Sequence, residues 1–216
     1  MKKTVSLSFC SILFAFNIHA ADKGWTGIPS SQFTLNPPPS AGSKEDKDDL
    51  AQVLVYQQTD RREACELGAS QEHPSFSTFY GKSDLLTQQE KKTKGPIVEK
   101  VMKLAVRVAS YHKGKFMRPR PYQRDRRIHP CIEAPTGQRS YPSSHAAAAS
   151  ASACVLSLAL PKKADELLNY GGYLGELRVI IGVHHPTDVK AGADLGWAVC
   201  EELQQRPDFM AELRAH

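Results

Sequence analysis

The chain has 216 residues, of which 41% are hydrophobic, enough for one well-buried core and too few for two. Its formal net charge is +5, and it falls to +3 without residues 1–20, because Lys2 and Lys3 are lost with no acidic residue. Such a weak positive charge gives no support to nucleic-acid binding, so we expect no nucleic-acid partner.

Residues 1–20 have the pattern of a secretory signal peptide. Lys2 and Lys3 precede an apolar run from Val5 to Phe16, and the segment ends on the small residue Ala20. This pattern predicts cleavage after Ala20 and a periplasmic or secreted protein. The alternative is a buried N-terminal helix.

The rest of the chain divides into an arm, residues 21–43, and one helical domain, residues 44–216. The arm is rich in Pro, Gly and Ser, which predicts an extended segment lying on the domain. Apolar residues at helical spacing then predict a helix from residue 44 to about residue 67 and a second over residues 97–113. We expect Pro96 in the first turn of that second helix.

Five prolines within residues 118–142, the last of them Pro142, predict a loop, and a loop of this length usually has a function. Further helices are expected over residues 145–160, 164–183 and 186–205. No alternating apolar run indicates a sheet, so we predict an all-α, single-domain helical bundle. The most apolar stretch, residues 145–160, is too short to span a bilayer, so no integral membrane segment is expected after signal cleavage.

Four cysteines remain after the predicted cleavage: Cys65, Cys131, Cys154 and Cys200. An even number in an exported protein predicts disulfides, and three pairings are possible. The alternative is buried free thiols within helices. Because no Cys-x-x-Cys pair is present, we expect no structural zinc, and we predict no other metal or cofactor.

The last of three polar clusters contains Arg178, His184 and Asp188. His184 and Asp188 are four residues apart at a helix start, so their side chains share one face. A carboxylate that accepts from one ring nitrogen leaves the other as a lone pair, able to act as a nucleophile. His185 is the rival nucleophile, since helical geometry also permits its contact with Asp188.

Two clusters precede it. Ser143 and Ser144 come just before a predicted helix, whose first amides and dipole suit a phosphate, and His145 follows where it can protonate a leaving group. Lys113 and Arg120 can hold further phosphate oxygens, Arg120 through its planar fork. Either cluster alone has an ordinary explanation, a capped helix or a solvated basic face.

Together the clusters fit a site that holds a phosphate, attacks it with one histidine and protonates its leaving group with another. Their order and spacing resemble the signature K-x6-RP, PSGH and SR-x5-H-x3-D of the type 2 phosphatidic acid phosphatase superfamily. The matching segments are Lys113-x6-Arg120-Pro121, Pro142-Ser143-Ser144-His145 and Arg178-x5-His184-x3-Asp188. The proline-rich stretch 36–43 is similar to the arm of the soluble class A bacterial non-specific acid phosphatases. Ser144 replaces a glycine of the pattern, and Leu177 replaces a serine.

The resemblance implies the acid phosphatase and vanadium haloperoxidase fold and a phosphohistidine route without metal. It assigns His184 as the nucleophile that Asp188 orients, and His145 as the acid. It places the phosphate among Lys113, Arg120, Ser143, Ser144 and Arg178. The function expected is an exported acid phosphatase acting on small phosphomonoesters, as a monomer or homo-oligomer.

Three alternatives remain. A lipid or isoprenoid phosphate phosphatase would use the same residues. A vanadium-dependent haloperoxidase would bind vanadate at the phosphate position, although such proteins usually have longer chains. A non-catalytic phosphate-binding protein would have no use for the two histidines and the carboxylate.

Overall fold

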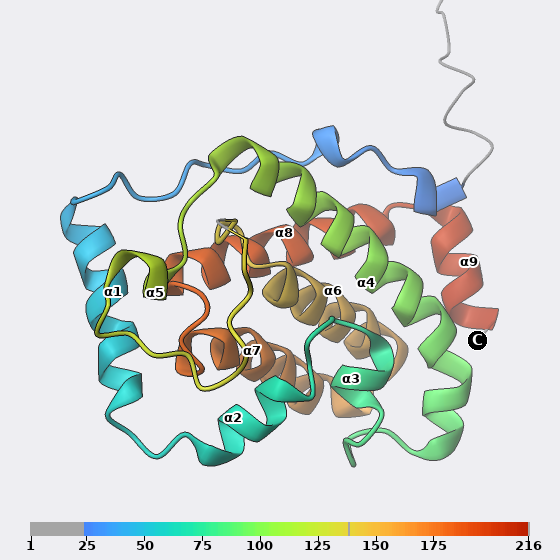
Figure 1. Ribbon diagram of the computed structural model, residues 1–216. Coiled ribbons are helices and arrows are strands. Elements are labelled where there is room, and N and C mark those ends of the chain that lie inside the picture. Colours follow the sequence, from blue (N-terminus) through green and yellow to red (C-terminus); the bar gives the residue numbers. More distant parts are fainter. Residues whose placement is uncertain (1–23, 138, 216) are drawn as a thin grey trace, which may run out of the picture.

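The computed structural model describes residues 24–137 and 139–215, and within them every regular element is a helix (Figure 1). The all-α prediction is therefore confirmed. The predicted signal peptide, residues 1–20, lies outside the described residues. No helix of the described part is long and apolar enough to cross a membrane.

Four long helices form the core: α4 (Gln88–Phe116), α6 (Ser144–Ala159), α7 (Ala164–Ile180) and α8 (Pro186–Gln204). Helix α6 packs against the other three, and every residue from Ala146 to Leu156 is buried. The alanine-rich sequence of α6 suits this position, because short side chains let neighbouring helices approach from several sides.

The contact between α6 and α8 is especially close. A side chain at Gly192 would overlap the carbonyl oxygen of Ser143, and one at Gly196 would overlap that of Ala147. The disulfide between Cys154 and Cys200 joins the same two helices.

The N-terminal arm crosses the outside of α4 (Figure 1). It contains two short 3-10 turns, Gly24–Gly27 and Ser30–Gln32, then runs extended to residue 40 and turns at residues 41–42 before α1. Arg107 of α4 donates to the carbonyl oxygens of Thr26 and Ile28, and His112 contacts that of Phe33. These bonds hold the arm against the domain.

The predicted helix from residue 44 to about residue 67 is wrong in its length. The structure has α1 (Lys44–Gln57) and a separate α2 (Arg62–Ala69). Between them the Thr59 hydroxyl donates back to the carbonyl of Tyr56, and the Asp60 carboxylate accepts from the Arg62 amide. Such side-chain bonds compete with helical ones, so the chain turns and a new helix begins.

Helix α4 also begins earlier than predicted, so Pro96 lies inside it and not in its first turn. Its start is set by a capping box, in which Thr87 accepts from the Glu90 amide and Glu90 accepts from the Thr87 amide. Two otherwise unpaired amides are satisfied in this way, which outweighs the preference of proline for a first turn.

Three short helices were not predicted: α3 (Phe76–Tyr80), α5 (Pro121–Arg124) and α9 (Pro207–Ala215). Helix α5 lies inside the segment expected to be loop, and Pro121 occupies its first position. The remaining long helices begin and end within three residues of their predicted bounds.

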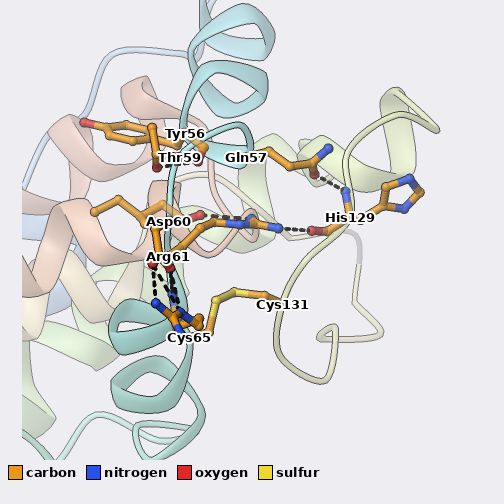
Figure 2. Close-up of a disulfide and its surroundings, with 10 residues drawn as sticks. Tyr56, Gln57, Thr59, Asp60, Arg61, Cys65, His129 and Cys131 are labelled. Carbon is orange, nitrogen blue, oxygen red and sulfur yellow. Dashed lines mark hydrogen bonds and ion pairs between the residues drawn. A yellow bond between two sulfur atoms is a disulfide. The ribbon is translucent and has the colours of Figure 1, made fainter.

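Figure 2 shows how the loop after α5 is fastened to α1 and α2. Cys131 is bonded to Cys65 of α2. Gln57 bonds the backbone of residues 127 and 129, and Arg61 donates to the His129 carbonyl. The cysteines therefore form two disulfides, which the sequence predicted without fixing their pairing.

Candidate active site

A cavity of about 610 Å³ collects most of the predicted site residues. Six of them line it: Lys113, Arg120, Ser144, His145, Arg178 and His184. They come from α4, the loop after it, the first turn of α6, the end of α7 and the turn before α8. The opposite wall comes from residues 68–74 and 132–136.

The turn between α7 and α8 presents His184 to the cavity. Gly182 has a φ of 84°, a left-handed conformation that glycine adopts without strain. The amides of Val183 and His184 both donate to the carbonyl of Arg178. One short turn thus connects Arg178 to His184, which explains why these two site residues are six positions apart.

The hydrogen-bond partners of His184 show which of its ring nitrogens carries the hydrogen and which has the lone pair. Its Nε2 lies 3.3 Å from Nη1 of Arg120, and its Nδ1 lies 3.4 Å from Oδ2 of Asp188. Because a guanidinium only donates and a carboxylate only accepts, the hydrogen belongs on Nδ1 and the lone pair on Nε2. Burial, together with nearby Arg120, holds the pKa of His184 well below its ordinary value.

The carboxylate of Asp188 accepts hydrogen bonds from more donors than the sequence predicted. Its Oδ2 accepts from Nδ1 and from the backbone amide of His185, each at 2.9 Å, and from the Ser140 hydroxyl at 2.5 Å. Burial alone would raise its pKa, but the bonds from His184 and His185 hold that pKa well below the ordinary value. His185 itself is fully buried and does not line the cavity.

His145 is held by a backbone acceptor. Its Nε2 lies 2.7 Å from the carbonyl oxygen of Gln71, in the segment after α2. A carbonyl only accepts, so Nε2 carries a hydrogen and Nδ1 is the nitrogen able to gain or lose a proton. Burial, reinforced by the charge of Arg178, keeps the pKa of His145 well below its usual value.

The two serines before His145 have different surroundings. Ser143 is fully buried outside the cavity lining: its amide donates to the carbonyl of Asp188, and its hydroxyl accepts from the Ala146 amide. Ser144 lines the cavity. Among the described residues, the amides of Ser144 and His145 have no acceptor, so the first turn of α6 offers two N–H groups at the cavity.

Lys113 and Arg120 both donate to carbonyl oxygens, and Arg120 also contacts Nε2 of His184. The ammonium of Lys113 donates to the carbonyls of Arg139 and Ser140, and Arg120 donates to those of Val183 and Gly137. Burial, assisted by Arg120, lowers the pKa of Lys113 to about 7. Neither residue has an ion-pair partner among the described residues.

Arg178 is the most isolated cation of the cavity. Its side chain is 2% exposed, and within the described part of the chain its Nε and Nη1 have no hydrogen-bond partner. Burial, followed by the neighbouring Arg120, lowers its pKa to about 10. An unpaired buried guanidinium is costly, so this side of the cavity is built for an anion.

The opposite wall combines apolar and acidic side chains. The loop that follows the disulfide-bonded Cys131 contributes Ile132, Ala134 and Pro135. The acidic side chains are Glu72 and Glu133, and both residues are exposed to solvent. The substitution at Leu177 has no direct effect on the cavity, because this residue is buried in a separate apolar cluster.

Sequence reasoning missed Arg118, which it treated as part of a solvated basic run. The side chain is 5% exposed and donates to Asp188, to Thr187, and to Asp46 and Asp49 of α1. The arginine's neighbourhood gave no signal, because its partners lie about 70 residues away in either direction.

Comparison with known proteins finds relatives that match about a third of the chain. Non-specific acid phosphatases of Salmonella typhi and Salmonella typhimurium are each 43% identical over 74 residues, which is 34% of this chain and 30% of each relative. The non-specific acid phosphatase of Providencia stuartii is 40% identical over 75 residues, or 35% and 30%. The match therefore spans less than a third of each curated relative.

The model of one protein family covers a longer segment. That of the PAP2 superfamily matches residues 101–210, just over half of the chain. The matched segment includes all three polar clusters, helices α6, α7 and α8, and α4 from residue 101 onward. The all-helical fold agrees with the same assignment, and the chain belongs to the PAP2 superfamily.

Proposed function

We propose that this protein is an exported, metal-independent acid phosphatase that hydrolyses small phosphomonoesters through a phosphohistidine. One observation carries the proposal: around Nε2 of His184, which bears no hydrogen, the cavity gathers three cations that have no carboxylate partner among the described residues. The partial relatives named non-specific acid phosphatase support the same reaction class.

In the first step, Nε2 of His184 attacks phosphorus and the bond to the ester oxygen breaks. His145 gives the proton of Nδ1 to that leaving oxygen, so the alcohol departs neutral. Lys113, Arg120 and Arg178 hold the phosphoryl oxygens, and the two free amides at the start of α6 add further donors. Ser143 acts through its contacts with α6 and Asp188.

In the second step, His145 takes a proton from water, and the oxygen of that water attacks phosphorus. The bond between phosphorus and Nε2 breaks, inorganic phosphate forms, and His184 returns to its starting tautomer. Asp188 accepts from Nδ1 of His184 throughout, which stabilises the ring while Nε2 is bonded to phosphorus.

A panel of phosphomonoesters tests the function directly. We expect turnover at acidic pH that survives a metal chelator and is blocked by vanadate, with incorporation of phosphate into His184 after rapid quenching. Turnover restricted to phosphorylated lipids would favour the lipid phosphatase. Bromide oxidation in the presence of vanadate and peroxide would favour the haloperoxidase, and binding of phosphate without turnover would favour a binding protein.

Export is supported by the signal-like sequence and by the two disulfides, which form in oxidising compartments. The mass of the protein recovered from the periplasm or the medium tests it. We expect a chain that begins near Ala21 and has no free thiol. A chain that keeps residues 1–20 inside the cytoplasm would contradict the proposal.

A further inference from the structure

The largest group of buried charges in the described structure includes Asp188 and no residue that lines the cavity. Arg118 stands at its centre, with the carboxylates of Asp46, Asp49 and Asp188 around it, and Arg124 completes the group by bonding Asp46. Arg118 and the three carboxylates are each at most 5% exposed. Three carboxylates and the guanidinium of Arg118 are thus removed from water at one place, and Arg124, whose side chain is 19% exposed, borders them.

Such a group is a poor device for stability alone. Removing charges from water costs several kcal/mol for each ion, and buried ion pairs are often replaced by apolar residues without loss. Ordinary packing would hold α1 against α7 and α8 at lower cost. A role in the site explains the presence of these charges better, because the network ends on the carboxylate that orients His184.

The geometry shows how Arg118 acts on Asp188. Its Nη1 donates to Oδ1 of Asp188 at 2.7 Å, while Oδ2 faces both histidines. Its Nη2 donates to Asp49 at 2.7 Å and to Asp46 at 3.1 Å. The planar guanidinium is therefore fixed at both ends, and it holds one oxygen of Asp188 so that the other faces His184.

Helix α1 also contacts the start of α8 directly. One oxygen of Asp49 accepts from the amide of Thr187 at 3.0 Å, and the other accepts from the Thr187 hydroxyl. The same hydroxyl accepts from Arg118. Asp49 therefore fixes both the arginine and the helical turn that carries Asp188.

We propose that Arg118 is a positioning residue, an inference that rests on the proposed function. Through this arginine, Asp46 and Asp49 of α1 hold the Asp188 carboxylate in the orientation that keeps the hydrogen of His184 on Nδ1. Helix α1 is thereby part of the catalytic apparatus, although neither it nor Arg118 touches the cavity.

The test compares Arg118→Lys and Asp49→Asn with a matched control. Asp48→Asn makes the same change on the same helix, at an exposed carboxylate that pairs, within the described part of the chain, with Lys44 alone. Asparagine at position 49 retains an oxygen that can accept from Thr187, so this variant should fold even if Arg118→Lys does not.

Two measurements separate positioning from a merely structural role. Steady-state kinetics per folded molecule should show kcat lowered about 10- to 100-fold in Asp49→Asn with KM changed less than about twofold, since the phosphate ligands stay in place. The nitrogen NMR shifts of His184 at neutral pH should indicate the pure Nδ1–H tautomer in the natural protein and a mixture of the two tautomers in Asp49→Asn. Asp48→Asn should match the natural protein in both.

Natural kcat and natural His184 shifts in Asp49→Asn would overturn the proposal. Equal changes in Asp49→Asn and Asp48→Asn would also overturn it, since the effect would then be one of general charge. If the natural protein shows no turnover, the proposed function is refuted. The NMR comparison would still decide whether Arg118 and α1 set the tautomer of His184.

Discussion

Replacing Arg178 with methionine should make the free protein more stable and unable to bind phosphate. The side chain is buried, and its Nε and Nη1 have no partner within the described residues. Burial, followed by the neighbouring Arg120, lowers its pKa from the ordinary value to about 10, which corresponds to a cost of about 3 kcal/mol for keeping the charge buried. Methionine fills a similar volume without that charge.

For a domain of this size, 1 kcal/mol shifts Tm by roughly 2–4 °C, so we expect Arg178→Met to raise Tm by roughly 6–12 °C in the absence of phosphate. Phosphate at about 100 times its Kd should stabilise the natural protein by about 2.7 kcal/mol and leave the variant unchanged. Thermal unfolding followed by fluorescence, with and without phosphate or vanadate, measures both effects.

Arg118→Met is the matched control, because this arginine is equally buried but fully paired. Its removal takes the guanidinium partner from Asp49 and Asp188 and leaves Asp46 with Arg124 alone, and it should lower the free energy of unfolding by about 3–5 kcal/mol. The reasoning fails if Arg178→Met is less stable than the natural protein without phosphate, or if phosphate still raises its Tm by the natural amount.

Four further predictions concern the reaction and the cavity wall. His184→Ala should abolish turnover and phosphate incorporation, whereas His185→Ala, outside the cavity, should keep measurable activity; the opposite result in quenched-flow labelling would make His185 the nucleophile. His145→Ala should lose roughly 100- to 10,000-fold on alkyl phosphates and clearly less on phosphates of acidic phenols, so equal losses would argue against an acid role. Because the pKa of Lys113 is about 7, its ammonium is present below pH 7 and is lost above it, so the affinity for inorganic phosphate, measured by competitive inhibition, should fall as pH rises through 7. In Lys113→Arg this loss should disappear, and an unchanged profile would contradict the role of the ammonium. Cys131→Ser should lower the free energy of unfolding by about 2–4 kcal/mol and raise KM, and a variant with natural KM would show that the disulfide is not needed to place the wall.

The sequence was most informative where function and short-range geometry coincide. The spacing of Arg178, His184 and Asp188 corresponds to one turn and the start of a helix, so their proximity followed from local structure. Lys113 and Arg120 were identified because the motif pairs them with Arg178, and the cavity brings these three cations together.

Contacts between distant segments could not be predicted in the same way. Arg118 and its carboxylate partners are separated by about 70 residues, and no periodicity connects them. The bond from His145 to the Gln71 carbonyl involves a backbone atom, which every residue type provides, so the sequence has no signal for it. Pro96 misplaced the start of α4 because the capping box of Thr87 outweighs it.

The glycines that bring α8 against α6 have a consequence for how this site can vary. Gly192 and Gly196 face backbone oxygens of α6, so the separation of the two helices is set by main-chain atoms that every sequence shares. His145 lies in the first turn of α6, and His184 lies just before α8. The distance between the two histidines is therefore fixed by the packing of these two helices. Changes in substrate preference, by natural divergence or by engineering, should therefore arise in residues 68–74 and 132–136, whose side chains can change size without altering that distance.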